Sequence, residues 1–467
     1  MFQKQTYIER RNALRRRMPN GGIVLLLGNG EAPRNYFDNA YHFRQDSTFL
    51  YFFGLQNANL IGIIDLDNEE NDTIFGNDYT VDDIIWMGPQ PSICDLAASV
   101  GVAHSAPLAD ARTAVQAAVR GGRKVHYLVP YRGEGVLQMS QLTGISPTEH
   151  YNHYSTDLAI SVAALREEKS PEEIEELQRA FQIGYAMHTT AMRMTKAGVS
   201  ERAIAGAMEG VTHQLGDGVS FHSIVSQHGE TLHNHSHDGI CENGRLMLVD
   251  AGGETVNNYC SDHTRTFPVS GKFSPLQKDI YNVVLHAHDE VLRIAKPGMY
   301  TDLHNASYKA LAEGLIGLGL MRGNADEAVA AGAMRLFMPH GLGHGLGMDV
   351  HDCEAMGERG MADYGAMLAR ADEIDTCIIR ERWRLRPGTV LTDEPGIYFI
   401  PAYIEQWKAE QKCAEFINYA KLEALYNFGG IRIEDDLLIT EDGNIMLGGD
   451  KHIPVTVDEI EAFMAEN

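Results

Sequence analysis

The chain has 467 residues and a formal net charge of −25, because 39 Lys and Arg stand against 64 Asp and Glu. An acidic surface of this size repels nucleic-acid phosphates and anionic lipid headgroups, so we expect neither nucleic acid nor a membrane as a partner. The length exceeds that of one ordinary hydrophobic core and predicts two domains.

The N-terminal segment favours a cytoplasmic protein. No apolar run of signal-peptide length precedes its charged residues, and no later window has the uninterrupted apolar length of a membrane span. The six cysteines contain no C-x-x-C pair, which indicates reduced thiols rather than a disulfide framework.

Residues 20–150 alternate short apolar runs, such as "GGIVLLLGN" and "NLIGIIDL", with helix-like segments. This alternation is typical of an α/β domain with its own sheet. A strong helix start follows near residue 170 and marks a boundary near residue 160. We therefore predict two domains, 1–160 and 161–467.

The helix start near residue 170 has three signals in a row. Ser170 is a good N-cap, Pro171 suits the first helical position, and Glu173 completes a capping box. The spacing of small and apolar residues predicts that the helix continues until Gly198, where a glycine is suited to end it.

Several later strands carry polar residues at their ends, as in "RLMLVDAG", "DHTRTFPVSG", "GTVLTDEPGIYF" and "GIRIEDDLLIT". Strand alternation puts Asp250 on the apolar face of Leu246 and Leu248, where its carboxylate loses hydration. Asp262 opens the next strand on the face of Thr264. A metal ion is the simplest compensation for two such carboxylates, although turn-forming and helix-capping aspartates are commoner than ligands.

Two segments of the second half read as insertions, at 356–385 and 401–428. The first is mixed and charged, and the second has a helical spacing of Ile404, Trp407, Ala414 and Ile417. We expect both to be surface additions.

The stretch "FMPHGLGHGLGMDVHD" contains His340, His344 and His351. Its alternating glycines predict a loop that lets the backbone approach another group closely, rather than a helical zinc site. Further on, Glu394 ends a strand, and Arg432 shares a strand face with Glu434.

The motifs D-A-G, S-D-x-T-R-T, H-G-x-G-H, D-E-P-G-x-Y and R-I-E-D together resemble the creatinase/methionine aminopeptidase superfamily of "pita-bread" metallopeptidases. The front stretch "YHFRQDSTFLYFFGL" resembles the N-terminal domain of its aminopeptidase P branch, the Xaa-Pro aminopeptidases. The resemblance implies an α/β (α+β) fold class, with an N-terminal creatinase-like α/β domain before a C-terminal pita-bread catalytic domain.

The resemblance also implies a site for two divalent metal ions, with Asp262 and Glu434 as bridging ligands. Such an oxygen-rich site suits Mn²⁺, which we expect first, while Co²⁺, Mg²⁺ and Zn²⁺ stay open as alternatives. The five implied metal ligands are Asp250, Asp262, His344, Glu394 and Glu434.

The implied reaction is hydrolysis of the bond between an N-terminal residue and a following proline, by a hydroxide that bridges the two ions. By resemblance Glu394 also moves the proton, His351 steadies the oxyanion, and His233 lies near the substrate. His340 would line the proline pocket, and Arg432 would lie on the substrate side. Peptides with proline in second position are the implied partners, and a homodimer or homotetramer is implied.

Two alternatives stay open. A prolidase (Xaa-Pro dipeptidase) would use the same metal ligands, and a metal-free pseudoenzyme would keep the fold as a peptide- or protein-binding module. Two departures from the family pattern are also evident. The spacing from Asp250 to Asp262 is one residue longer than expected, which predicts a bulge or longer turn, and Asp393 stands where an apolar residue or threonine is more usual.

Overall fold

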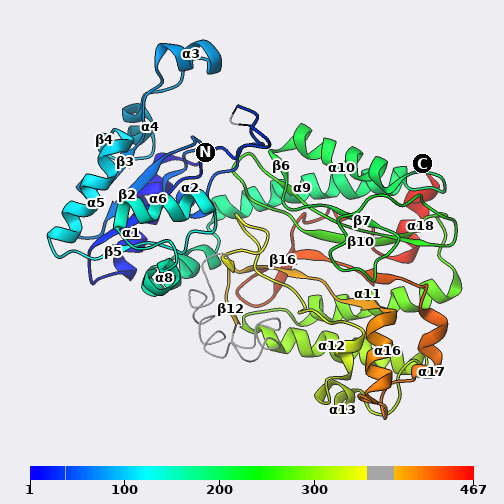
Figure 1. Cartoon of the computed structure of the whole chain (residues 1–467). Coiled ribbons are helices and arrows are strands. Elements are labelled where there is room, and N and C mark those ends of the chain that lie inside the picture. Colours follow the sequence, from blue (N-terminus) through cyan, green and yellow to red (C-terminus); the bar gives the residue numbers. More distant parts are fainter. Residues whose placement is uncertain (37, 355–382, 467) are drawn as a thin grey trace. The chain divides into compact units, whose positions relative to one another are not determined.

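The computed structural model describes residues 1–36, 38–354 and 383–466 (Figure 1). The chain forms two compact units: Met1–Arg166, and Glu167–Asp352 with the described residues from 383 onward. The expected insertion at 356–385 lies outside the described residues up to position 382. Among the described helices, none is both long and apolar enough to cross a membrane.

The first unit is built on a five-stranded sheet in the order β4-β3-β2-β1-β5. Its two central strands, β1 and β2, pair antiparallel and are almost wholly buried, as expected for runs of Ile, Val and Leu. The strands are β1 Ile23–Leu27, β2 Ile61–Asp65, β3 Thr73–Phe75, β4 His104–Ala106 and β5 Val125–His126.

Helices alternate with these strands along the chain, as the sequence predicts, and most of them lie beside the sheet (Figure 1). They are α1 Lys4–Arg17, α2 Ser47–Phe53, α3 Val81–Met87, α4 Ile93–Ser99, α5 Ala111–Arg120, α6 Gly133–Thr143, α7 His150–His153 and α8 Thr156–Glu167, with short 3₁₀ turns η1 Glu69–Asn71 and η2 Leu108–Asp110.

The second unit begins with α9, Pro171–Met194, and its start is as predicted. Ser170 and Glu173 form a reciprocal capping box, and Pro171 occupies the first turn. The predicted end was wrong, because Thr195 already has extended backbone angles. Gly198, at φ +88°, serves a different purpose: its N–H donates to Cys241 O at 2.9 Å and turns the chain toward the next helix.

Short sheets form the middle of the second unit, in the orders β10-β8-β7, β13-β16-β17, β14-β15, β6-β9 and β11-β12. The strands are β6 Gly218–Val219, β7 Ile224–Ser226, β8 Leu246–Ala251, β9 Gly253–Glu254, β10 His263–Pro268, β11 Gly298–Met299, β12 Arg384–Leu385, β13 Val390–Asp393, β14 Gly396–Tyr398, β15 Gly430–Arg432, β16 Asp435–Ile439 and β17 Asn444–Met446.

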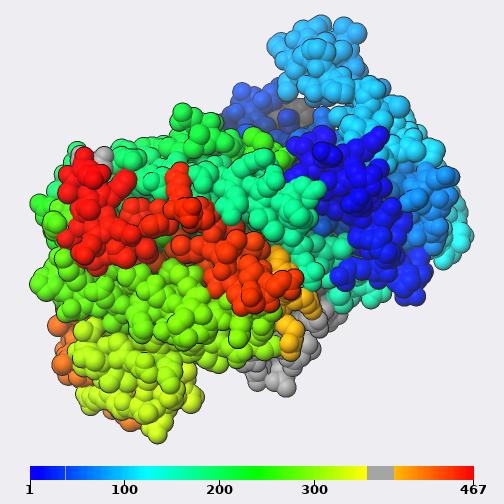
Figure 2. All heavy atoms as spheres, turned by 180° about the vertical axis from the view of Figure 1, so that it is seen from behind, coloured from blue at the N-terminus to red at the C-terminus, as the bar shows by residue number. Residues whose placement is uncertain are grey.

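Helices pack in pairs beside these sheets, α9 with α10 and α11 with α12, and apolar side chains of both pairs join the strands in one core. The C-terminal helix α18 packs on α9 and α11, and Figure 2 shows it in red among the green segments. The helices are α10 Glu201–Leu215, α11 Pro275–Ile294, α12 Tyr300–Gly317, α13 Ala325–Ala330, α16 Pro401–Ala409, α17 Tyr419–Leu422 and α18 Val457–Ala465, with 3₁₀ turns η3 Ala333–Leu336 and η5 Glu423–Leu425.

The segment 401–428 differs from its prediction. The helical spacing holds only over α16, because Gln411 and Cys413 adopt positive φ angles of 54° and 49° and end the helix. Ile404 and Trp407 are buried in the core of the unit, so the expectation of a surface addition is wrong for this helix.

Candidate metal centre

Two neighbouring strands bring Asp250 and Asp262 together. In the antiparallel register of β8 and β10, Asp250 lies opposite Thr264, and Asp262 directly precedes β10. The connection contains β9 and a turn in which Asn258 has φ 58°. Both carboxylates are buried.

Glu434 reaches the same place from another part of the chain. It forms a β-bridge with Thr264, and its N–H donates to Thr264 O at 3.0 Å. The Thr264 hydroxyl donates to Glu434 Oε2 at 2.6 Å. Thr264 therefore fixes both the backbone and the carboxylate of Glu434.

His344 lies in the glycine-rich loop, which has the irregular structure that its glycines predict. The N–H of His344 donates to Thr392 Oγ1 at 3.0 Å, and Thr392 N–H donates to His344 O at 2.9 Å. A Cβ at Gly343 would lie 1.9 Å from Thr392 O, so only glycine permits this approach of the loop to β13. The loop thereby aims the imidazole at the carboxylates.

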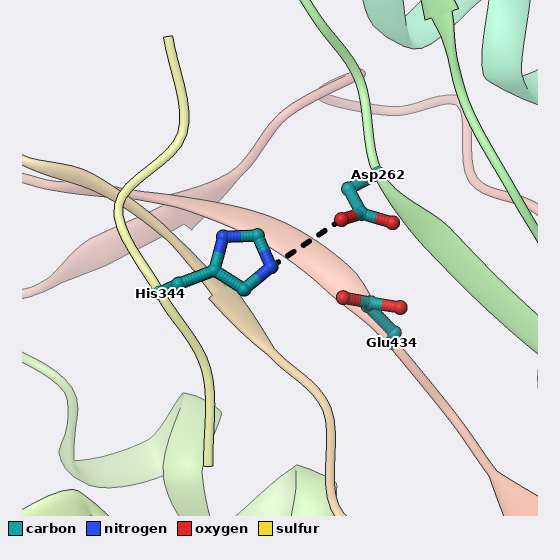
Figure 3. A group of neighbouring side chains, drawn as sticks. All are labelled: Asp262, His344 and Glu434. Carbon is teal, nitrogen blue, oxygen red and sulfur yellow. Dashed lines mark ion pairs between the residues drawn. The ribbon is translucent and has the colours of Figure 1, made fainter. Parts of the chain in front are cut away.

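Asp262, His344 and Glu434 offer ligand atoms that all lie within 4.8 Å of one another, and all three residues are buried. His344 Nε2 lies 3.4 Å from Asp262 Oδ2, the contact drawn in Figure 3. Asp262 Oδ1 is buried without a hydrogen-bond partner among the described residues. A converging set of two carboxylates and an imidazole, with one oxygen unsatisfied, suits a divalent cation.

The electrostatics support the same conclusion. Burial raises the pKa of Asp262 well above its usual range, and the charges of Glu434, Asp250, Asp436 and Glu394 raise it further. Burial likewise raises the pKa of Glu434, with Glu394 and Asp250 as the next causes. Positive charge at this point would relieve the crowding of these carboxylates.

The other two predicted ligands lie at the edge of this group. Glu394 follows β13, is partly exposed, and places Oε1 3.7 Å from His344 Nε2. Asp250 Oδ2 accepts a hydrogen bond of 2.5 Å from Arg432 Nη2. The structure therefore brings three of the five into one group and holds Asp250 through an ion pair.

Arg432 and His340 meet at Tyr398. Arg432 Nη1 donates to the Tyr398 hydroxyl at 2.7 Å, and His340 Nε2 lies 2.8 Å from the same oxygen. Arg432 is only 4% exposed. Burial lowers the pKa of His340 to about 3, and the charge of Arg432 lowers it too, so His340 stays neutral at physiological pH.

His351 and His233 are both exposed. The His351 ring stacks on His344, with centroids 3.8 Å apart and planes 22° apart. His233 lies close enough to His340 for its charge to lower the pKa of His340 further.

Sequence reasoning assigned no role to Thr264, Thr392 or Tyr398, although all three hold candidate residues in place. The signal was present for two of them, because Thr264 and Tyr398 lie inside the S-D-x-T-R-T and D-E-P-G-x-Y motifs, and Thr392 directly precedes the second motif. It also missed a charged cluster behind the site. There Arg265 Nη2 donates to both carboxylate oxygens of Asp435, at 2.8 and 2.9 Å, and His288 lies beside Asp435 and Asp393.

Comparison with known proteins gives matches over both parts of the chain. Residues 175–441 match metallopeptidase family M24, and residues 7–127 match the aminopeptidase P N-terminal domain. A site built from carboxylates and histidine in such a fold defines a metallohydrolase. The chain belongs to metallopeptidase family M24, which acts with divalent metal ions.

Curated relatives match over nearly their whole length. The chain is 33% identical to human Xaa-Pro dipeptidase over 95% of this chain and 89% of that protein. It is 31% identical to the Xaa-Pro aminopeptidase of Escherichia coli over 99% of this chain and 98% of that protein. The zinc-substituted E. coli aminopeptidase P in complex with product superposes with a TM-score of 0.80 at 29% identity, covering 100% and 99% of the two chains.

These matches confirm two predictions. The α/β fold class, with an N-terminal aminopeptidase P domain before a C-terminal M24 domain, is correct. The resemblance to aminopeptidase P is also correct.

Proposed function

We propose that this protein is a metal-dependent Xaa-Pro aminopeptidase, which hydrolyses the bond between an N-terminal residue and a following proline. The observation that carries the proposal is the buried group of Asp262, His344 and Glu434, in a chain that matches aminopeptidase P from end to end. Proline removes the amide N–H and fixes φ, so its peptides need a dedicated pocket.

The ligand set is the one that the sequence motifs give. Two divalent ions, with Mn²⁺ as our first choice, would be held by Asp250, Asp262, His344, Glu394 and Glu434. When bound, such ions acidify a water and polarise the scissile carbonyl. Four carboxylates offset four positive charges, and the raised pKa values of Asp262 and Glu434 support this balance.

Side chains around the group supply the remaining functions. Glu394, which is partly exposed beside His344, would hold a proton and pass it to the leaving nitrogen. His351 has an exposed ring stacked on His344 and would donate to the developing oxyanion. His233, His340 and Arg432 would contact the substrate, and the hydroxyl of Tyr398 joins the last two.

The domains would run over 1–160 and 161–467, with catalysis in the second. We also propose a cytoplasmic protein that forms homodimers or homotetramers. Of these proposals only the assembly rests on the family resemblance alone, and size-exclusion chromatography with light scattering tests it.

A prolidase activity is the second candidate, because human Xaa-Pro dipeptidase is 33% identical over 95% of this chain. The deciding experiment uses metal-stripped protein with Ala-Pro and Ala-Pro-Ala, before and after addition of Mn²⁺. Metal-dependent cleavage of the tripeptide supports the aminopeptidase, and cleavage of the dipeptide alone supports the prolidase.

Variants separate an enzyme from a binding module. Asp262→Asn and Glu434→Gln remove one ligand oxygen each and should abolish hydrolysis, while Glu441→Gln, at an exposed acid, is the matched control. A wild-type protein that cleaves neither peptide with Mn²⁺, Co²⁺ or Zn²⁺ would contradict both enzyme proposals.

A further inference from the structure

Glu394 directly follows β13 and Glu434 directly precedes β16, and these two paired strands have a second, rear face. In the register of β13 and β16, Asp393 lies directly opposite Asp435. Side chains alternate along a strand, so these two aspartates point away from their neighbours Glu394 and Glu434. Two like charges directly opposite on one face destabilise a sheet unless a cation lies between them.

Asp393 is completely buried, and neither of its carboxylate oxygens has a hydrogen-bond partner among the described residues. An isolated buried carboxylate is costly, so it needs a positive charge nearby. His288 of α11, itself 2% exposed, supplies one: its Nε2 lies 3.8 Å from Asp393 Oδ2.

The same nitrogen of His288 lies 3.2 Å from Asp435 Oδ2. One imidazole therefore faces the carboxylates of both strands. Burial lowers the pKa of His288, but the charge of Asp393 and the contacts with Asp289 and Asp435 outweigh it and raise the pKa to about 10. The pKa of about 10 favours an imidazolium at His288, while burial raises the pKa of Asp393 well above its usual range and the charge of His288 lowers it.

The other side of Asp435 is fixed by Arg265, which donates to both of its oxygens. Asp435 thus has two cationic partners, Arg265 and His288. Among the described residues, His288 is the cation that faces Asp393. Loss of His288 would leave Asp435 paired and Asp393 uncompensated. Replacement of His288 should therefore displace mainly β13, the strand that Glu394 follows.

We propose that His288 is a positioning residue for the metal centre, because it ties Asp393 of β13 to Asp435 of β16 and so sets the separation of Glu394 and Glu434. The inference rests on the metal ligands given under the proposed function. It assigns a role to the aspartate that departs from the family pattern: Asp393 and His288 act as one pair.

The test is a double-mutant cycle on metal-stripped, full-length protein, with His288→Gln, Asp393→Val and the double variant. His286→Gln is the matched control, since His286 is exposed on the same helix. The dissociation constant of Mn²⁺ is measured by competition with a chromophoric chelator. The thermal midpoint in excess chelator reports separately on whether each variant folds.

We expect His288→Gln to weaken Mn²⁺ binding by about tenfold or more, the usual cost of removing a group that orients a metal ligand. In the Asp393→Val background, His288→Gln should weaken Mn²⁺ binding by less than about threefold, because the carboxylate that His288 faces has been removed. A role in folding alone would lower the thermal midpoint without changing the dissociation constant.

Two results would overturn the inference. One is an unchanged Mn²⁺ affinity in folded His288→Gln protein, and the other is an equal loss of Mn²⁺ affinity from His288→Gln in the wild-type and Asp393→Val backgrounds. Failure of the wild-type protein to bind Mn²⁺, Co²⁺ or Zn²⁺ is a different result, because it would overturn the metal centre itself. The two failures are therefore distinguished by the wild-type titration.

Discussion

The Thr264 hydroxyl donates to Glu434 Oε2 at 2.6 Å and accepts a hydrogen bond of 3.1 Å from Arg432 Nε. One small side chain on β10 thus connects the carboxylate of a proposed metal ligand to the guanidinium that holds Asp250. Hydroxyl and carboxylate are both buried, so water cannot replace this bond at low cost.

Thr264→Val keeps the shape of the side chain and removes only the hydroxyl. Glu434 loses a donor and Arg432 an acceptor, so we expect Mn²⁺ affinity and kcat/KM to fall by about tenfold or more. Metal titration and steady-state kinetics on Ala-Pro-Ala measure both. Thr113→Val, at an exposed threonine of α5, is the control. Values within about twofold of wild type would show that the hydroxyl does not orient the ligand.

Tyr398→Phe removes the oxygen that His340 and Arg432 share. Arg432 is then buried, and His340 half-buried, with one polar contact missing, which costs about 1–3 kcal/mol for a buried group. If these residues contact the substrate, kcat/KM should fall by about tenfold while metal content stays at the wild-type level. Elemental analysis and kinetics, with Tyr151→Phe as an exposed control, check this. If the variant instead loses metal, Tyr398 orients the metal ligands through Arg432 and does not act on the substrate.

Gly343→Ala would place a methyl group 1.9 Å from Thr392 O. The loop must move away from β13, and His344 must move with it, so we expect loss of metal binding together with a lower thermal midpoint. Gly206→Ala is the control, because a Cβ there meets nothing within 4 Å and alanine suits its helix. Full Mn²⁺ affinity in Gly343→Ala would show that the loop adapts without cost.

His288 makes the stability depend on pH in a defined direction. Its pKa is raised from 6.5 to about 10 in the fold, since Asp393, Asp289 and Asp435 outweigh burial. A cationic group whose pKa is higher in the folded state stabilises that state fully at pH values below its unfolded pKa. This stabilisation is lost as the pH rises through its folded pKa. The gap in unfolding free energy between wild type and His288→Gln should therefore be largest at about pH 6 and shrink toward about pH 10.

Urea unfolding of metal-stripped protein across this pH range measures that gap. His286→Gln, on the exposed side of α11, should show a small gap without this trend. A gap for His288→Gln that is constant with pH, or that grows as pH rises, would contradict an imidazolium between the two aspartates.

Removal of metal should lower the thermal midpoint of the wild-type protein. An ion that binds only the folded state adds about 2.7 kcal/mol at a concentration one hundred times its dissociation constant. Calorimetry with and without chelator measures the shift, and Glu434→Gln should abolish most of it. An equal shift in the variant would place the stabilising ion elsewhere.

Much of the site could be predicted from the sequence, because each candidate residue lies in a short motif whose local structure is simple. The strand before Asp250, the glycine loop of His344 and the strand end at Glu394 are as predicted. The ion pair of Arg432 with Asp250 could not be foreseen, since it joins β15 to β8 and depends on the packing of distant strands.

The helix boundaries show the same division between local and distant causes. The start of α9 follows from Ser170 and Glu173, which are neighbours on the chain. Its end was misplaced: the helix stops at Met194, and Gly198, which was expected to end it, donates instead to Cys241, far along the chain. His288 was missed for the same reason, because nothing near it in the sequence indicates that it faces Asp393.

The candidate ligands are distributed along the chain from Asp250 to Glu434. During synthesis, a ribosome must complete nearly the whole C-terminal half before the last carboxylate emerges. The complete ligand set therefore cannot form before Glu434 has been synthesised, so an ion held by all five residues enters only after that point. Early fragments released by stalled translation would carry Asp250 and Asp262 without their partners, and they should neither retain metal nor resist proteolysis.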